Sequence, residues 1–182
     1  MNNLSNTEKE MFESKDICLN FDFSITEKLA NRIGKSRIIF TGKQAKNRAL
    51  KFNLKNRVEA YFASDLFQYT DFSDTFLFLC SNSGKTKEVI LLLEYAKKHG
   101  AICIAVTAVA DSILTKRCDE KIILSCGFEK GVAATKSVVE QGLIYDSLIF
   151  HLAKNQGKRV DFNTLKKELI KAGEKMIKNI NR

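Results

Sequence analysis

The sequence contains no proline and no tryptophan, two histidines, and nine glycines scattered along its 182 residues. Because no proline- or glycine-rich stretch marks a linker, the length fits one globular domain. No apolar run approaches the roughly 18 residues that a membrane-spanning helix requires. The polar start, MNNLSNTEKEMFESKD, lacks the basic and apolar regions of a secretory signal. These absences predict a cytoplasmic domain without a membrane partner.

Cysteine and histidine are placed too sparsely for a metal site. The five cysteines are odd in number and mostly lie within apolar runs (Cys18, Cys80, Cys103, Cys118 and Cys126). No pair has the C-x-x-C spacing of a zinc or thioredoxin site, and His99 and His151 are far apart in the chain. We therefore expect buried free thiols in a reducing compartment, and no metal ion or cofactor.

Carboxylates are missing from residues 28–57, which carry ten lysines and arginines. A second basic block, residues 154–182, carries nine against three carboxylates, and the whole chain has a net charge of +9. A nucleic-acid surface would need interleaved aromatic side chains, but the first block offers only Phe40 and Phe52. The charge therefore favours a lysine-rich solvated surface and no nucleic-acid partner. A basic field would also attract a phosphorylated metabolite.

Short apolar runs alternate with longer helical patterns. Strand-like runs cover residues 37–41, 58–62, 75–80, 101–107 and 121–125, and helical patterns cover about 43–56, 86–99, 111–117, 135–154 and 160–180. The continuous apolar run at 75–80 is typical of a strand covered on both faces. The alternation predicts an α/β fold: a doubly wound, five-stranded parallel sheet flanked by helices, as in a flavodoxin-like three-layer sandwich.

We expect three parts: a helical or extended segment over residues 1–24, the sheet domain over 25–155, and a C-terminal amphipathic helix over 156–182. The expected helix at 135–154 is apolar, and the tail repeats apolar residues at helical spacing. Both surfaces need partners, so we expect a homodimer or homotetramer.

Three hydroxyls and a glycine follow the third strand run, in the string Cys80-Ser-Asn-Ser-Gly-Lys-Thr86. In doubly wound sheets, ligands bind outside the carboxyl ends of the strands. The free N–H groups at the start of the next helix favour an anion, and hydroxyls add donors. Ordinary N-capping needs a single Ser or Thr and no glycine. The loop therefore predicts a phosphate site. A nucleotide P-loop is excluded because Leu79 stands where that motif needs its first glycine.

A second string, Glu129-Lys-Gly-Val-Ala-Ala-Thr-Lys136, also opens a helix on the carboxyl side of a strand. Gly131 allows an unusual backbone conformation, and Thr135 lies at the helix start. Taken alone, a glycine turn with a threonine cap explains this string equally well. Two hydroxyl-bearing helix starts at one sheet edge favour a joint ligand site.

Together the two loops resemble the sugar isomerase (SIS) domain, a phosphosugar-binding α/β module. Its S-x-S-G-x-T phosphate motif is similar to residues 81–86. The G-V-A-S-T-K segment of glucosamine-6-phosphate synthase and of tagatose- or galactosamine-type sugar-phosphate isomerases is similar to residues 131–136, and their V-E-x-A-S-E-F stretch to residues 58–65. The resemblance implies that a phosphate is held by Ser81, Asn82, Ser83, Gly84 and Thr86. It implies a sugar site lined by Lys43, Gln44, Val132, Ala134 and Lys136.

The sequence departs from the family where the chemistry would occur. The family's G-T-S-like turn reads Gly42-Lys-Gln44 here, and Ala134 replaces the serine of V-A-S-T-K. Aldose–ketose isomerisation needs a base to move a proton between adjacent carbons. The resemblance places that base, a Glu, and a His in a second SIS domain. Within this chain the candidates are Glu59, Asp65, Glu129 and His151, each of which also has a structural explanation.

Three functions therefore remain open. The chain is an aldose–ketose sugar-phosphate isomerase or a subunit of one, completed by a further SIS chain, or a non-catalytic phosphosugar-binding or regulatory module. The third is the sensor half of a sugar-responsive transcription factor, although about 24 residues before the sheet domain are too few for a helix-turn-helix. The sequence fits both a natural single-domain protein and half of a two-domain one.

Overall fold

The computed structural model describes residues 5–41, 52–131 and 134–180. Its elements are α1 (Asn6–Asn20), η1 (Phe23–Thr26), α2 (Glu27–Ile33), β1 (Arg37–Phe40), β2 (Val58–Ala60), η2 (Ala63–Gln68), β3 (Thr75–Cys80), α4 (Lys87–Lys98), β4 (Ile102–Thr107), α5 (Ile113–Arg117), β5 (Glu120–Ile123), α6 (Lys136–Asn155) and α7 (Phe162–Ile180). All five expected strands form, with ends within two residues of the predicted ones. The helix expected over about 43–56 lies mainly outside the described residues.

The strands form one parallel sheet in the order β2-β1-β3-β4-β5, which confirms the doubly wound fold and its flavodoxin-like order. Phe40 of β1 pairs with Phe78 of β3, and Cys80 of β3 pairs with Val106 of β4. Because every pair is parallel, the carboxyl ends of all the strands meet at one edge of the sheet. In this strand order the winding reverses between β1 and β3, and ligands bind outside that point.

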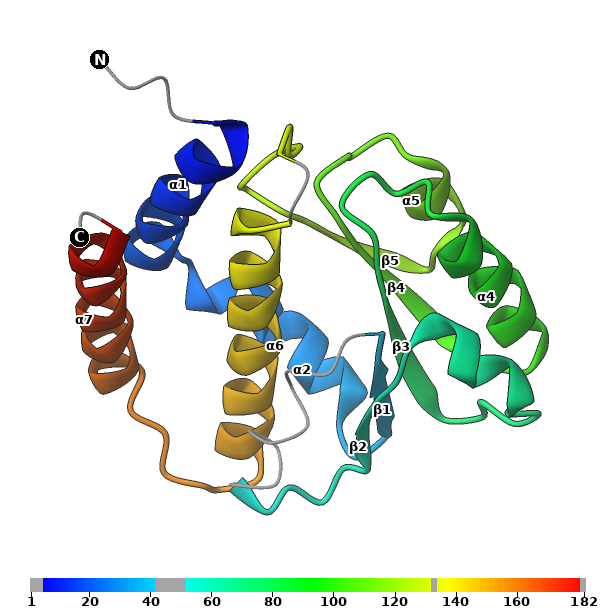
Figure 1. Ribbon diagram of the computed structural model, residues 1–182. Helices are drawn as coiled ribbons and strands as arrows, with labels where there is room; N and C mark the ends of the chain where they lie inside the picture. The colour runs from blue at the N-terminus through cyan, green and yellow to red at the C-terminus, as the bar shows by residue number, and fades with distance from the viewer. Residues whose placement is uncertain (1–4, 42–51, 132–133, 181–182) are drawn as a thin grey trace.

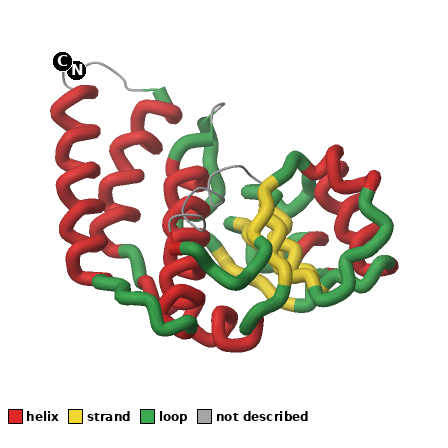
Figure 2. The backbone as a smooth tube through the Cα atoms, turned by 90° about the horizontal axis from the view of Figure 1, so that it is seen from below, coloured by secondary structure: helices red, strands yellow, loops and turns green. Residues whose placement is uncertain are grey.

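Alternate residues of β3 face opposite sides of the sheet, as expected for a strand covered twice. Phe76 and Phe78 pack into the cluster that contains α2 and α6, whereas Leu77 and Leu79 pack into the cluster that contains α4. Figures 1 and 2 show the helices lying on both sides of the strands. The two buried faces explain why the sequence of β3 is a continuous apolar run.

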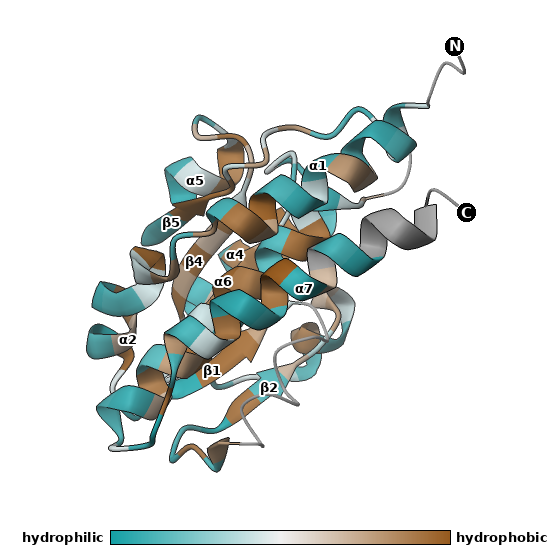
Figure 3. Ribbon diagram, turned by 90° about the vertical axis from the view of Figure 1, so that its left-hand side faces the viewer, coloured by the Kyte–Doolittle hydropathy of each residue, from teal (hydrophilic) through white to brown (hydrophobic). Residues whose placement is uncertain are grey.

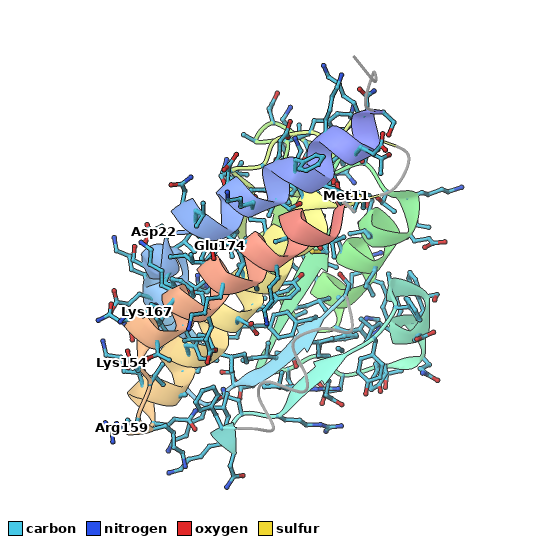
Figure 4. All side chains as sticks on the ribbon, turned by 60° about the vertical axis from the view of Figure 1, so that its left-hand side comes forward. Met11, Asp22, Lys154, Arg159, Lys167 and Glu174 are labelled. Atoms are coloured by element: carbon cyan, nitrogen blue, oxygen red, sulfur yellow. The ribbon has the colours of Figure 1, made fainter. Side chains whose placement is uncertain are left out.

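Helices α1 and α7 lie side by side on the outer surface of α6 and add a layer to the sandwich (Figures 1 and 3). Phe162 of α7 packs edge-on against Phe23 and Phe150, with ring centroids 5.9 and 6.1 Å apart. Lys167 and Glu174 lie along the exposed side of α7 (Figure 4). Both α6 and α7 thus have partners within the chain, so their apolar faces give no argument for the expected oligomer.

All five cysteines are free thiols, and Cys18 and Cys103 are buried. Within the described ranges, no three His, Cys, Asp or Glu side chains gather in a way that could hold a metal ion. No helix in this part of the chain combines the length and the apolar character needed to cross a bilayer.

Candidate functional site

The loop of residues 81–86, between β3 and α4, leaves a helix N-terminus uncapped. Thr86 is the N-cap residue, but its side chain makes no capping hydrogen bond. Its Oγ1 instead lies 2.7 Å from Ser81 Oγ, while Ser83 Oγ accepts from Lys85 N at 3.3 Å. Because first-turn N–H groups have no partner within their own helix, the start of α4 is available to an anion, with three hydroxyls beside it.

The 81–86 loop turns at Gly84 and is held by the neighbouring strand. Gly84 has φ = 63°, a left-handed conformation that favours glycine. Its N–H donates to Ser81 O at 3.0 Å, and its carbonyl accepts from Leu114 N at 3.2 Å. The first bond closes the turn within the loop and the second ties the loop to α5, while Ser81 N donates to Val106 O of β4 at 3.1 Å.

Asn82 connects the 81–86 loop to the loop that follows β5. Its carbonyl accepts from Ala108 N at 3.1 Å and from Thr107 Oγ1 at 3.0 Å. Its Oδ1 accepts from Glu129 N at 3.5 Å. Its Nδ2 is buried and has no hydrogen-bond partner among the described residues. A buried donor of this kind fits an acceptor atom of a ligand.

Glu129 occupies the N-terminus of α6. Its Oε1 accepts from Thr135 N at 2.6 Å and from Ser137 N at 3.3 Å, and its Oε2 accepts from Ser137 Oγ. Burial raises the pKa of this carboxyl, but the four hydrogen bonds from Ser137 and Thr135 outweigh burial and hold the pKa below its ordinary value. The two expected helix starts therefore differ: Glu129 caps α6, whereas the N-cap residue of α4, Thr86, makes no capping hydrogen bond through its side chain.

The glycine at 131 serves a different purpose from the one expected. Gly131 is not among the glycines with positive φ. A β-carbon there would instead lie 2.6 Å from Glu10 Oε2 and 2.9 Å from Thr7 Oγ1, so a side chain at this position would have to displace these two side chains of α1. The expectation of an unusual backbone conformation at Gly131 was therefore wrong, and close packing is the reason.

Of the five expected sugar contacts, the structure describes two, Ala134 and Lys136. Lys43, Gln44 and Val132 lie outside the described residues, and Ala134 is exposed. Lys136 is 8% exposed, and its Nζ lies 2.6 Å from Glu13 Oε2. Burial lowers the pKa of this lysine, but the bond to Glu13 and the charges of Glu13 and Glu10 more than offset it and raise the pKa overall.

Three carboxylates hold the region between β5 and α6, and no sequence motif predicted their roles. Glu10 of α1 reaches the segment before α6, and Glu13 reaches Lys136, the first residue of α6. Glu140 of α6 is 2% exposed and accepts from Ser125 N and Cys126 N at 2.7 and 2.8 Å. Their partners are distant in sequence or are backbone groups, which no motif spacing reveals.

Glu59 is a buried carboxylate in an ionic network away from the carboxyl edge of the sheet. It accepts from Arg37 Nε at 2.6 Å, Arg57 Nη2 at 3.0 Å and Tyr61 Oη at 2.8 Å. Burial raises the pKa of Glu59, but its hydrogen bonds and the two arginine charges outweigh burial and lower it. Because Arg37 begins β1, the carboxylate lies toward the amino end of that strand.

Neither Asp65 nor His151 is hydrogen-bonded to the 81–86 loop within the described residues. Asp65 is exposed in the first turn of η2. His151 is buried, with Nε2 at 2.8 Å from Phe23 O. At 1.5 Å per residue, His151 is about 22 Å along α6 from Lys136. Of the four candidate bases, Glu129 alone contacts the 81–86 loop.

The fold and the candidate site define a doubly wound α/β domain with three hydroxyls at the start of α4, beside the strand-order reversal. A family model, SIS domain, matches residues 33–151. The chain therefore belongs to the SIS domain family, and the resemblance stated from the two loops is confirmed.

The comparisons agree in family and in fold. The chain is 26% identical over 176 residues to a glutamine–fructose-6-phosphate aminotransferase [isomerizing] of Clostridium perfringens, covering 91% of this chain and 28% of that relative. It thus spans less than a third of this relative's length. Its fold matches the C-terminal domain of glucosamine-fructose-6-phosphate aminotransferase from Francisella tularensis, with a TM-score of 0.73 and 21% identity over 98% of this chain and 54% of that chain.

A smaller solved structure matches the chain over most of both lengths. An E. coli protein in complex with a sugar phosphate has a TM-score of 0.65 and 19% identity, covering 85% of this chain and 89% of that one. At these identities the likeness establishes the fold alone.

Proposed function

We propose that this chain binds a sugar phosphate, with the phosphate held by Ser81, Asn82, Ser83, Gly84 and Thr86. The observation that carries the proposal is the uncapped N-terminus of α4 beside three hydroxyls. A phosphate dianion would accept from the free N–H groups and gain from the helix dipole. The E. coli structure with its sugar phosphate and the aminotransferases named for fructose 6-phosphate support this ligand class.

The proposed reaction is aldose–ketose isomerisation, with the chain supplying the phosphate-binding part of a site that a further SIS chain completes. An enediol mechanism needs a base that can accept a carbon-bound proton. Glu59 and His151 are bonded elsewhere, Asp65 is exposed in η2 beside Ser64, and Glu129 already accepts hydrogen bonds from α6. The same engagement of these candidates supports the alternative, a non-catalytic phosphosugar-binding module.

The first test is calorimetric titration of the full chain with fructose 6-phosphate, arabinose 5-phosphate, fructose and inorganic phosphate. We expect the two sugar phosphates to bind and fructose not to bind. Ser83→Ala removes a hydroxyl whose oxygen accepts one 3.3 Å bond and whose proton is free to donate. It should weaken binding of the sugar phosphates roughly tenfold or more, because hydrogen bonds to charged groups are stronger than neutral ones.

The matched control is Ser64→Ala, which removes an exposed hydroxyl in η2 and should leave affinity unchanged. Equal affinity for fructose and fructose 6-phosphate would contradict phosphate recognition.

An activity assay separates the two proposed functions. If the native assembly converts the bound ketose phosphate and Ser83→Ala does not, the protein is an isomerase. If the native assembly binds the sugar phosphate without converting it, the protein is a binding module. Light scattering on the same sample tests the proposed homodimer or homotetramer. A cytoplasmic location remains part of the proposal, consistent with five free thiols.

A further inference from the structure

Two carboxylates of α1 hold the segment that leads into α6. Glu10 is 5% exposed. Its Oε1 accepts from Lys130 N at 2.6 Å, and its Oε2 accepts from Gly131 N at 3.1 Å. Figure 1 shows the start of α1 beside this loop, above the first turn of α6. One side chain thus provides acceptors for two consecutive backbone N–H groups.

Helix α1 packs closely against the backbone at Gly131. A β-carbon at Gly131 would lie 2.6 Å from Glu10 Oε2 and 3.1 Å from Thr7 Cα. One turn further along α1, Glu13 Oε2 lies 2.6 Å from Nζ of Lys136, the first residue of α6. Helix α1 therefore fixes residues 130–131 on one side and Lys136 on the other.

The segment that α1 fixes adjoins the proposed phosphate site. Glu129, directly before it, donates its N–H to Asn82 of the 81–86 loop. Ala134 and Lys136 are expected sugar contacts, whereas no hydrogen bond between described residues joins the phosphate-binding loop to α1. Helix α1 also precedes residues 33–151, the part of the chain that matches the SIS family.

We propose that Glu10 is a positioning residue for the sugar-binding side of this site, supported by Glu13. The inference rests on the proposed phosphosugar binding and extends the functional unit to α1. The Glu10 carboxylate holds the backbone at Lys130 and Gly131, and the Glu13 carboxylate holds the side chain of Lys136. The phosphate side is built on the loop after β3 and is held by β4 and α5; its 3.5 Å bond toward this segment joins Asn82 to Glu129, not to the two residues that Glu10 holds.

The test measures the affinities of the wild-type chain and of Glu10→Ala for fructose 6-phosphate and for inorganic phosphate. Both ligands are titrated while the NMR spectrum of the protein is recorded. Two buried N–H groups lose their acceptor in the variant, so affinity for fructose 6-phosphate should fall about tenfold. Affinity for inorganic phosphate should change less than about twofold, because α4 and its loop are untouched. Amide exchange at Lys130 and Gly131 should become faster.

The matched control is Glu8→Ala on the same helix. Glu8 is exposed and bonds to Ser5 in the capping box. The substitution weakens α1 without touching the loop, so fructose 6-phosphate affinity should stay at the wild-type value. If Glu10→Ala does not fold, Glu10→Gln and Glu13→Gln keep the side-chain volume and take its place. Glu10→Gln retains one acceptor oxygen and should fall between wild type and Glu10→Ala.

Unchanged fructose 6-phosphate affinity in a folded Glu10 variant overturns the inference. An equal loss for fructose 6-phosphate and inorganic phosphate also overturns it, because the effect would not be confined to the sugar side. Wild-type protein that binds neither probe removes the proposed function itself. Wild-type binding that Glu10 variants leave intact removes only the role of α1, so the two failures are distinguishable.

Discussion

Gly84 and Ser112 lie so close together that a β-carbon at position 84 would be 2.3 Å from Ser112 Oγ. Ser112 is buried and caps α5 by accepting from Thr115 N. The turn of the 81–86 loop therefore packs against the start of α5. Glycine is needed at position 84 for two independent reasons, its positive φ and this contact.

Gly84→Ala should weaken sugar-phosphate binding by at least about tenfold and lower the free energy of unfolding by roughly 2–4 kcal/mol, since strain and overpacking add. Calorimetric titration and denaturant unfolding measure the two effects. The control is Gly157→Ala, where φ is 73° but nothing lies within 4 Å of the added carbon. It should lower stability by about 1 kcal/mol and leave binding unchanged. Equal effects of the two substitutions would show that the contact with Ser112 is unimportant.

The fold was predictable because each strand carries its own signal. The apolar run of β3 and the glycine at the end of α4 mark their elements without reference to the rest of the chain. Phe76 and Leu77 alternate between the two clusters as a twice-covered strand requires. By contrast, nothing local indicates that α1 lies against the loop before α6.

The candidate site was predictable only in its motifs. The spacing of Ser81, Ser83 and Thr86 identified the open start of α4, because those residues are neighbours in sequence. Glu59 and His151 were candidate bases because they are ionisable, but tertiary packing determines which groups they bond to. Neither Arg37, which lies 22 residues from Glu59, nor the carbonyl of Phe23 beside His151 can be predicted from spacing.

Asn82→Asp should nearly abolish binding of a sugar phosphate. The substitution keeps the shape of the side chain but replaces the buried Nδ2, which has no partner in the described part of the chain, with a carboxylate oxygen. Like charges about 4 Å apart repel by roughly 4 kcal/mol near a protein surface, so affinity should fall at least about a hundredfold. The control Asn163→Asp adds the same charge to an exposed position on α7 and tests the long-range effect. Similar losses in both variants would place the phosphate away from Asn82.

His151→Phe should change stability without changing ligand affinity. The phenyl ring keeps the packing against Phe162, whose ring centroid lies 5.0 Å away, but loses the bond to Phe23 O. That carbonyl still accepts from Ser147 Oγ at 2.7 Å, so the free energy of unfolding should fall by only about 1 kcal/mol. Unfolding and titration with fructose 6-phosphate are measured together. Intact stability with lost turnover would place His151 in the chemistry.

The Glu129 carboxylate should make stability depend on pH in the acid range. Its pKa is held below the ordinary value of 4.5, so the unfolded state binds the proton more readily. The stabilisation is therefore fully present above about pH 4.5 and disappears as pH falls through the folded-state pKa. Glu129→Gln should lower the free energy of unfolding at neutral pH by about 1–3 kcal/mol and flatten its decline between about pH 5 and pH 3.

Ser137→Ala tests the same contact from the other side. It keeps the carboxylate but removes the hydroxyl that donates to Glu129 Oε2, so its acid dependence should lie between those of wild type and Glu129→Gln. Urea unfolding at several pH values gives all three curves. If wild type and Glu129→Gln lose stability in parallel on acidification, the carboxylate does not carry a lowered pKa and does not cap α6. Their convergence at low pH is the expected result, because a protonated Glu129 resembles the amide that replaces it.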